Sequence, residues 1–273
     1  MKKIMTLAAI FAAVMMGFSA CQPEDQPSTP GTEETPGTNE ETPGTNEETP
    51  GTNEETPGEE EEATAAVTID GNFEDWDNLE GVQVATLPEG DCEYEQLKTF
   101  KLYADEEFIY IFCEFDPENT LVFVPYFDLD GDPATGNTSK WSGAGYEAKA
   151  EGGVFAEDGT EEAPVQGAPE AWDPEFYYYG ESTDEVLASG MAVTSSVPAA
   201  YKGGSTFAFE ASILRELVIE TYAGVFDGTK TDSFTMGMIQ YDLNWDYIGK
   251  LPCKTLAEKE AGELEPMLTV TLP

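Results

Sequence analysis

Short apolar stretches alternate with polar turns throughout residues 66–273. Most place an apolar side chain at every second position, which is the spacing of a strand with one buried face. The stretch 108–115 is apolar on both parities, which predicts a central strand covered on both sides. Further strands are expected over 96–103, 121–127, 146–150, 176–179, 186–188, 191–195, 206–211, 234–241 and 267–272. Pro125 suggests an edge position or a bulge for its strand.

Helical spacing is convincing only over 212–221, where apolar residues fall at 213, 214, 217 and 218. About ten short strands separated by Gly, Pro and Asp turns are typical of a sandwich. The pattern therefore predicts an all-β fold for residues 66–273. We expect an antiparallel, jelly-roll-like β-sandwich with one short helix, preceded by a disordered linker.

The first twenty residues have the pattern of a secretory signal peptide. Lys2 and Lys3 precede an apolar stretch over 5–18 that is too short for a stable membrane span. Residues 18–21 read Phe-Ser-Ala-Cys, which resembles a bacterial lipobox with Cys21 as the acylated residue. An ordinary signal peptide with a chance cysteine is the alternative. The acidic residues after Cys21 resemble the surface-export signals of Bacteroidetes lipoproteins. These resemblances imply an outer-membrane protein, anchored in the bilayer through Cys21 and facing the cell exterior.

Residues 21–65 are expected to be a linker. Thr-Pro-Gly-Thr-Asn-Glu-Glu recurs with a period of seven over 35–55, and no position of the repeat is apolar. A coiled coil needs two apolar positions per heptad, so this repeat cannot form one. Such a tract buries too little surface to offset its ordering entropy, and about 40 residues would span on the order of 40 Å.

Composition removes whole classes of function. The chain carries 55 acidic and 12 basic residues and no histidine, for a net charge of −43. Nucleic acid is an unsuitable partner because binding it requires clustered Lys and Arg. Without histidine there is no Ser-His-Asp triad and no His-ligated metal. Carboxylate chemistry and hard cations such as calcium remain.

One loop carries a candidate cation site. Asp128, Asp130 and Asp132 stand at alternate positions and could converge on one calcium ion, completed by backbone carbonyls and Glu147. The loop is not an EF-hand, because Pro133 occupies the sixth position, where that motif requires glycine. The alternative is a solvated acidic turn.

Aromatic side chains supply candidate sugar-binding surfaces. Flat rings stack on the C–H faces of pyranoses, while carboxylates and amides hold the hydroxyl groups. The candidate ligand-binding residues are Trp141, Trp172, Tyr178, Trp245 and Tyr247. For each ring the competing interpretation is a place in the core, which is also the role expected for Trp76.

Besides Cys21 the chain has Cys92, Cys113 and Cys253. Three cysteines allow at most one internal disulfide, with three alternative pairings. Cys113 lies in the predicted central strand and is expected to act as a small apolar core residue.

Several short motifs together resemble family 9 carbohydrate-binding modules. They lie at 69–76, 104–111, 127–136, 143–147 and 207–214. Two positions depart from the family pattern: Gly145 replaces a typical aspartate, and Leu214 replaces a typical proline. The resemblance spans roughly 66–273 and implies the fold more strongly than it implies sugar binding.

The sequence thus favours non-catalytic binding of a polysaccharide or other glycan by a tethered lipoprotein. A surface adhesion or structural domain that binds protein is the main alternative. A glycoside hydrolase is a third, because it needs only two suitably spaced carboxylates and the sequence singles out no pair.

Overall fold

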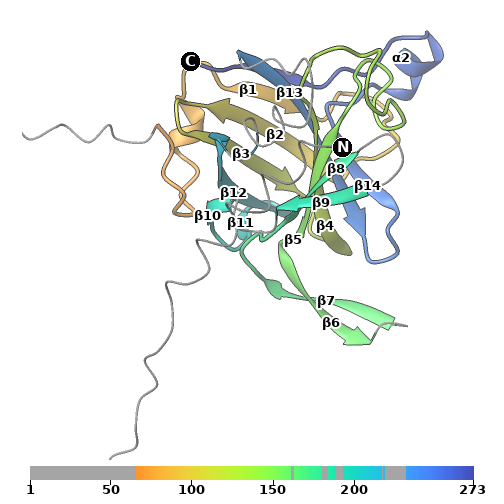
Figure 1. The fold of residues 1–273 in the computed structure, drawn as a ribbon. Helices are drawn as coiled ribbons and strands as arrows, with labels where there is room; N and C mark the ends of the chain where they lie inside the picture. The colour runs from red at the N-terminus through yellow and green to blue at the C-terminus, as the bar shows by residue number, and fades with distance from the viewer. Residues whose placement is uncertain (1–65, 161–162, 180–183, 189–192, 217, 219–231) are drawn as a thin grey trace, which may run out of the picture. The chain divides into compact units, whose positions relative to one another are not determined.

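A computed structural model of the chain describes residues 66–160, 163–179, 184–188, 193–216, 218 and 232–273. Cys21 and the predicted signal peptide and linker lie outside these residues. Two antiparallel sheets stack face to face as a sandwich (Figure 1). The predicted all-β, antiparallel fold is therefore confirmed.

Sheet A has the order β1-β2-β3-β12-β10, and β11 also pairs with β12. Its strands are β1 (Gln83–Thr86), β2 (Leu97–Ala104), β3 (Phe108–Phe115), β10 (Val193–Ser196), β11 (Ala200–Gly203) and β12 (Thr206–Leu214). The central strand β3 pairs along its whole length with β12, from Phe108 opposite Leu214 to Phe115 opposite Phe207.

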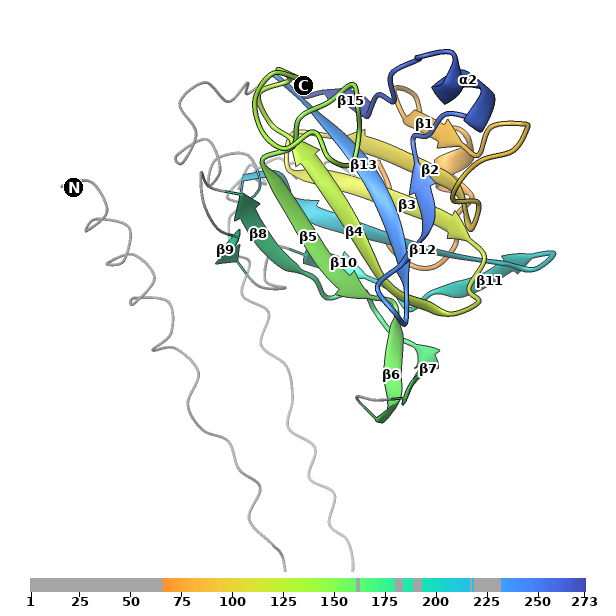
Figure 2. The same ribbon diagram turned by 90° about the vertical axis from the view of Figure 1, so that its right-hand side faces the viewer.

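Sheet B has the order β14-β13-β4-β5-β8-β9, and β15 also pairs with β13 (Figure 2). Its strands are β4 (Thr120–Asp128), β5 (Ala148–Gly153), β8 (Glu175–Tyr179), β9 (Asp184–Ala188), β13 (Ser233–Asp242), β14 (Tyr247–Leu251) and β15 (Leu268–Thr271). The long strand β13 accommodates two neighbours on one edge, β15 near its start and β14 near its end.

Three smaller elements complete the described fold. β6 (Phe155–Thr160) and β7 (Ala163–Pro169) form a separate hairpin, and η2 (Asp75–Asp77) is a single 3-10 turn. The short helix α2 (Leu256–Glu260) begins with a capping box, in which Thr255 and Glu258 each bond the backbone N–H of the other. Those two bonds satisfy donors that a helix start leaves unpaired.

The main core lies between the sheets and follows strand alternation. Ile109, Ile111 and Phe115 of β3 point into it, as do Phe123 and Phe127 of β4. All five are fully buried. The ring of Phe115 packs edge-on against Phe123 from the other sheet, with centroids 4.7 Å apart. Burial of these rings is the main source of stability.

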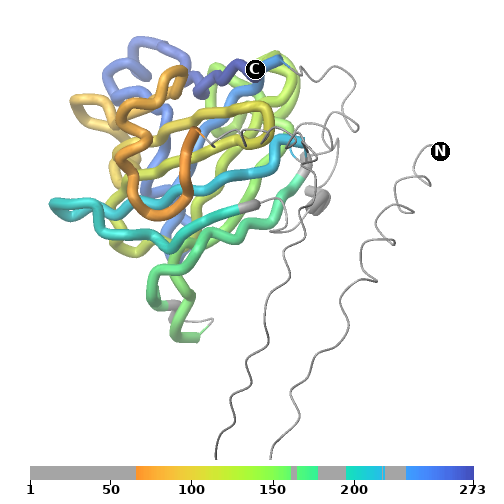
Figure 3. Tube along the Cα trace, turned by 90° about the vertical axis from the view of Figure 1, so that its left-hand side faces the viewer, coloured from red at the N-terminus to blue at the C-terminus, as the bar shows by residue number. Residues whose placement is uncertain are grey.

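The outer face of sheet A is covered by the chain that precedes β1. Val67 and Trp76 pack there on Tyr110 and Phe112, the β3 residues of the other parity. Figure 3 shows this segment in orange over the strands of sheet A. A covered outer face explains why residues 108–115 are apolar on both parities.

Two expectations about individual elements are wrong. Pro125 lies in β4, which is central because it pairs with both β13 and β5. The sheet tolerates the missing N–H because the β4–β5 ladder pairs only at 122–123 and 126–127, on either side of the proline. Of the predicted helix over 212–221, residues 212–214 belong to β12 because each pairs with β3, whereas the described residues 215, 216 and 218 are helical. Residue 217 and residues 219–221 of the predicted helix lie outside the described residues.

Among the described residues, no helix is long and apolar enough to cross a membrane.

Candidate functional site

The connection between β13 and β14 holds a tryptophan in an unusual backbone conformation. Trp245 has φ +64°, in the left-handed region that aromatic residues rarely adopt. The carboxylate of Asp242 accepts hydrogen bonds from the backbone N–H groups of Asn244 (2.8 Å) and Asp246 (2.9 Å). The N–H of Trp245 donates to the carbonyl of Asp242 at 3.0 Å. These bonds compensate the backbone strain, and strain of this kind is commonly found at functional sites.

Trp245 stands at one end of a row of four rings. Its side chain is 52% exposed, and its ring centroid lies 5.9 Å from that of Tyr241. Tyr241 packs edge-on to Tyr247 at 4.9 Å, and Tyr247 packs edge-on to Tyr94 at 5.4 Å. We call Tyr94, Tyr241, Trp245 and Tyr247 the aromatic row. Tyr241 is itself buried, so the rings of the row that reach the surface are Trp245, Tyr247 and Tyr94, and edge-to-face packing holds them in place.

A cation borders this row. The ammonium group of Lys140 lies 4.5 Å from the ring centroid of Tyr247 and 5.9 Å from that of Tyr126. Partial burial lowers the pKa of Lys140, and the nearby charges of Lys149 and Lys250 lower it further. The aromatic faces offset part of that cost through cation–π attraction.

Two of the predicted ligand-binding tryptophans are core residues, so those two predictions are wrong. Trp141 is fully buried on the outer face of sheet B, where its indole N–H donates to the carbonyl of Pro252 at 2.8 Å. Gly237 leaves the space that its ring fills, since a Cβ at that position would collide with the indole. Trp172 is 1% exposed and donates to the carbonyl of Gly152 at 3.0 Å. A ring without exposed surface cannot stack on a sugar.

The structure brings Trp245 and Tyr247 together, and Tyr247 is half-buried. Tyr178 lies in β8, and its side chain lies outside what the structure describes. The sequence interpretation missed Tyr94, Tyr241 and Lys140. Tyr94 and Lys140 come from loops far from β14 in the chain, so only the fold shows that they meet. For Tyr241 a signal exists, because it shares a strand parity with Ile239 and precedes the turn that carries Trp245.

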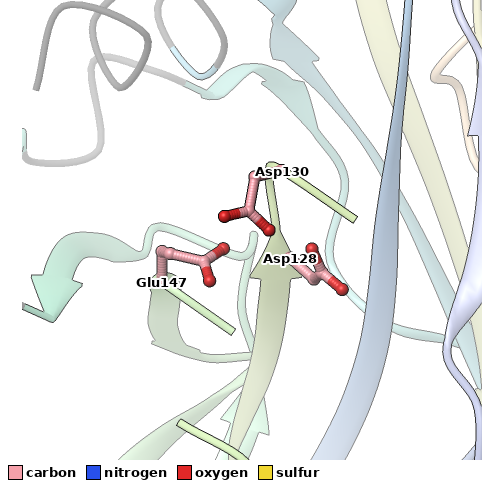
Figure 4. A group of neighbouring side chains, drawn as sticks. All are labelled: Asp128, Asp130 and Glu147. Carbon is pink, nitrogen blue, oxygen red and sulfur yellow. The ribbon is translucent and has the colours of Figure 1, made fainter. Parts of the chain in front are cut away.

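Three carboxylates form a second candidate site (Figure 4). Asp128 ends β4, Asp130 follows in the next turn, and Glu147 precedes β5. One oxygen of each lies within 4.8 Å of the others. Local bonds orient the group: Asp130 accepts from Thr135 Oγ1 at 2.7 Å, and Glu147 Oε2 accepts from the N–H of Leu129 at 2.9 Å.

Glu147 carries the strongest indication of a cation. Its side chain is 4% exposed, and its Oε1 has no hydrogen-bond partner among the residues that the structure describes. Burial, with the nearby charges of Asp130 and Asp128, raises its pKa to about 7. Gly136 leaves room for this oxygen, since a Cβ there would collide with Oε1. A buried acceptor beside two further carboxylates fits a hard divalent cation that takes oxygen ligands.

The prediction for Asp132 is wrong. Its side chain is outside the group and accepts a hydrogen bond from the N–H of Ala134 at 2.9 Å. Asp132 therefore shapes the loop, while Asp128, Asp130 and Glu147 could supply three of the six to eight oxygens that calcium takes.

No family model matches this chain, and no curated protein matches it. Among solved structures it is similar to a family 9 carbohydrate-binding module from Caldicellulosiruptor kristjanssonii, determined in complex with cellotriose. The alignment has 10% identity and a TM-score of 0.32, and it covers 76% of this chain and 89% of the other. The strand pairing in this chain defines the sandwich independently of that likeness.

Proposed function

We propose that this chain binds a neutral polysaccharide without cleaving it, through the aromatic row at the β13–β14 connection. The observation that carries the proposal is the exposed ring of Trp245, held in a strained conformation by the Asp242 carboxylate. The ring is half in solvent, and the bonds that hold this backbone conformation come from its own turn. An exposed, rigid indole supplies flat apolar area at low entropic cost.

Polar groups flank the ring in a way that suits a sugar. Asp242, Asn244 and Asp246 surround Trp245 in sequence, and the latter two are exposed. Carboxylates and amides can accept from and donate to hydroxyl groups, while the indole covers the C–H face of a pyranose. The net charge of −43 disfavours an anionic polymer, so the expected ligand is uncharged.

The test is a glycan array followed by affinity electrophoresis of the full chain in gels that contain a neutral polysaccharide. Trp245→Ala should weaken binding by about tenfold or more, since loss of an aromatic contact of this kind costs about 1.4 kcal/mol or more. Tyr201→Ala is the matched control, because Tyr201 is an exposed aromatic on sheet A. An array without signal from a folded protein would overturn the proposal and favour the protein-binding alternative.

The carboxylate group would serve this function as a structural calcium site. It bridges the end of β4, the loop at 129–146 and the start of β5, and that loop carries Trp141 into the outer face of sheet B. A cation held by Asp128, Asp130 and Glu147 would fix the loop. Isothermal titration with calcium, with Glu147→Gln as the variant, tests the site directly. Equal heats from both proteins would contradict it.

Acylation of Cys21 would place this binding domain at a membrane surface. Each buried methylene contributes about 0.8 kcal/mol, so several acyl chains on one cysteine anchor a protein firmly. Metabolic labelling with an alkynyl fatty acid should mark the full chain and fail to mark Cys21→Ser. An unlabelled wild-type chain would refute the anchor and leave glycan binding untouched.

A further inference from the structure

Cys92 and Cys253 are distant in sequence, but the fold places them in neighbouring segments. Cys92 lies in the loop between β1 and β2, and Cys253 follows β14. The N–H of Gln96 donates to the carbonyl of Ile248 at 2.8 Å, and the N–H of Leu256 donates to the carbonyl of Asp91 at 2.9 Å. The two segments therefore run antiparallel, and both cysteines lie between these anchors.

The thiols themselves meet. The side chains of Cys92 and Cys253 interact through a hydrogen bond. Charged contacts hold the surroundings in place: Lys259 pairs with Glu93 at 3.0 Å, and the N–H of Cys92 donates to Glu95 at 3.2 Å. The pair thus sits in a segment anchored at several points.

The third described cysteine is excluded from pairing by its position. Cys113 is fully buried in β3, where it faces Phe100 of β2 and Phe209 of β12. Its side chain packs in the main core between the sheets. Reaching another thiol would require opening that core, so one of the three pairings left open by the sequence is favoured.

We propose that Cys92 and Cys253 form an intramolecular disulfide when the folded protein meets an oxidised small-molecule disulfide or a disulfide-bearing oxidoreductase. One of the two thiolates attacks the oxidant's S–S bond, forms a mixed disulfide and releases one thiol. The other thiolate then displaces the second thiol from that mixed disulfide. Two thiol protons and two electrons leave the protein, and the oxidant's S–S bond is reduced to two thiols.

Burial controls the rate of this step. It raises the pKa of Cys92, and it raises the pKa of Cys253 to about 12, with the neighbouring Cys92 adding to the effect. Because the thiolate is the reacting species, the rate of oxidation should rise about tenfold per pH unit around neutrality. Slow disulfide formation at neutral pH suits a structural disulfide better than a redox-active disulfide that is repeatedly oxidised and reduced.

The bond would fasten the β1–β2 loop to the end of β14. That loop carries Tyr94, two residues beyond Cys92, and β14 carries Tyr247, which packs against Tyr94. The disulfide can form whether or not the aromatic row binds a glycan. A negative result for the disulfide can therefore be told apart from a negative result for glycan binding.

The first experiment is peptide mapping of the full chain. Protein incubated with oxidised glutathione is denatured, alkylated and digested without reduction. The expected result is a cross-linked peptide pair containing Cys92 and Cys253, with Cys113 recovered as an alkylated thiol. Recovery of Cys92 and Cys253 as alkylated thiols, stable glutathione adducts on either, or a link to Cys113 would overturn the proposal.

A second measurement does not depend on mapping. Oxidised wild-type protein should melt roughly 5–15 °C above the reduced protein, because a cross-link that closes a long loop restricts the unfolded state. The Cys92→Ser, Cys253→Ser double variant should show no difference between the two conditions. Cys113→Ala should keep the difference. Equal melting temperatures for oxidised and reduced wild type would count against the bond.

Discussion

Each outer face of the sandwich is covered in part by a segment that carries a buried tryptophan, but only on sheet B does a second tryptophan remain exposed nearby. On sheet A, Trp76 is buried, and its indole N–H donates to the buried carboxylate of Glu210 at 2.7 Å. On sheet B, Trp141 is buried in the same way, yet the neighbouring Trp245 remains exposed. On sheet A, the carboxylate of Glu210 holds the covering segment in place, whereas on sheet B an aromatic ring is left exposed to solvent.

Glu210 attaches the covering segment to the outer face of sheet A. Besides the indole of Trp76, it accepts hydrogen bonds from the backbone N–H groups of Asp70 (3.0 Å) and Gly71 (2.8 Å). All three donors belong to the covering segment, while Glu210 belongs to β12. At the exposed end of sheet B, the carboxylate of Asp242 bonds its own turn instead, which leaves the ring of Trp245 accessible.

The largest expected effect comes from releasing the segment that covers sheet A. Glu210→Ala removes one acceptor that serves three donors, the buried indole N–H of Trp76 and the partly buried N–H groups of Asp70 and Gly71, and a buried donor left unpaired costs about 1–3 kcal/mol. We expect a loss of roughly 3–6 kcal/mol in the free energy of unfolding, measured by urea denaturation. Glu114→Ala is the control, because Glu114 lies on β3, is partly exposed and forms an ion pair with Lys202 at 3.6 Å. A similar loss from both variants would mean that Glu210 has no special role.

Trp141→Ala should be nearly as destabilising, at about 3–5 kcal/mol, because it empties a fully buried site beneath Gly237. Trp245→Ala should change the free energy of unfolding by about 0.5 kcal/mol or less, as expected for an exposed side chain. Thermal and urea unfolding of both variants would measure the contrast. Equal destabilisation would remove the distinction between core and surface rings on this face.

A smaller effect should appear in the pH dependence of stability. The pKa of Glu147 is raised to about 7 in the folded protein, so folding favours its protonated form. The resulting stabilisation is complete below the pKa of the unfolded state and is lost as pH rises through about 7. Without metal, we expect melting temperatures to fall between about pH 5 and pH 8, with an upper limit of about 3 kcal/mol.

Calcium should remove most of that fall, because a bound cation stabilises the carboxylate form of Glu147. Burial raises the pKa of Glu210 too, so part of the pH dependence should persist in Glu147→Gln. Melting curves with calcium and with EDTA at both pH values would separate the two contributions. A calcium-independent pH profile in wild-type protein would argue against the cation site.

The sequence predicted the central strands well because their signal is local. Burial on both faces makes residues 108–115 apolar on both parities apart from Glu114, and β3 has those same limits. The short strand β14 was missed because its few residues carry no clear alternation. For residues 212–214, the apolar spacing suggested a helix, but pairing with β3 along residues 207–214 of β12 overrides that local preference.

The candidate site was predictable only in part, because the exposure of a ring depends on distant partners. Trp141 and Trp172 stand among polar residues in the sequence, yet each is buried with a backbone carbonyl as its partner. Neither partner can be inferred from the residues around the tryptophan. The aspartate at 132 was grouped with 128 and 130 by spacing, but its carboxylate accepts a hydrogen bond from the N–H of Ala134 and lies outside the carboxylate group.

The segment that covers sheet A also determines how the domain would respond to tension along the chain. Any tension transmitted along the chain from residues 1–65 enters the described domain just before Val67, ahead of all the strands. The contacts loaded first are those of the covering segment, which are the packing of Val67 and Trp76 on β3 and the hydrogen bonds to Glu210. They can rupture one at a time, whereas separating β3 from β12 would load a whole ladder at once. Under tension, this segment would therefore detach before the strands separate, and the sandwich beneath it would stay folded.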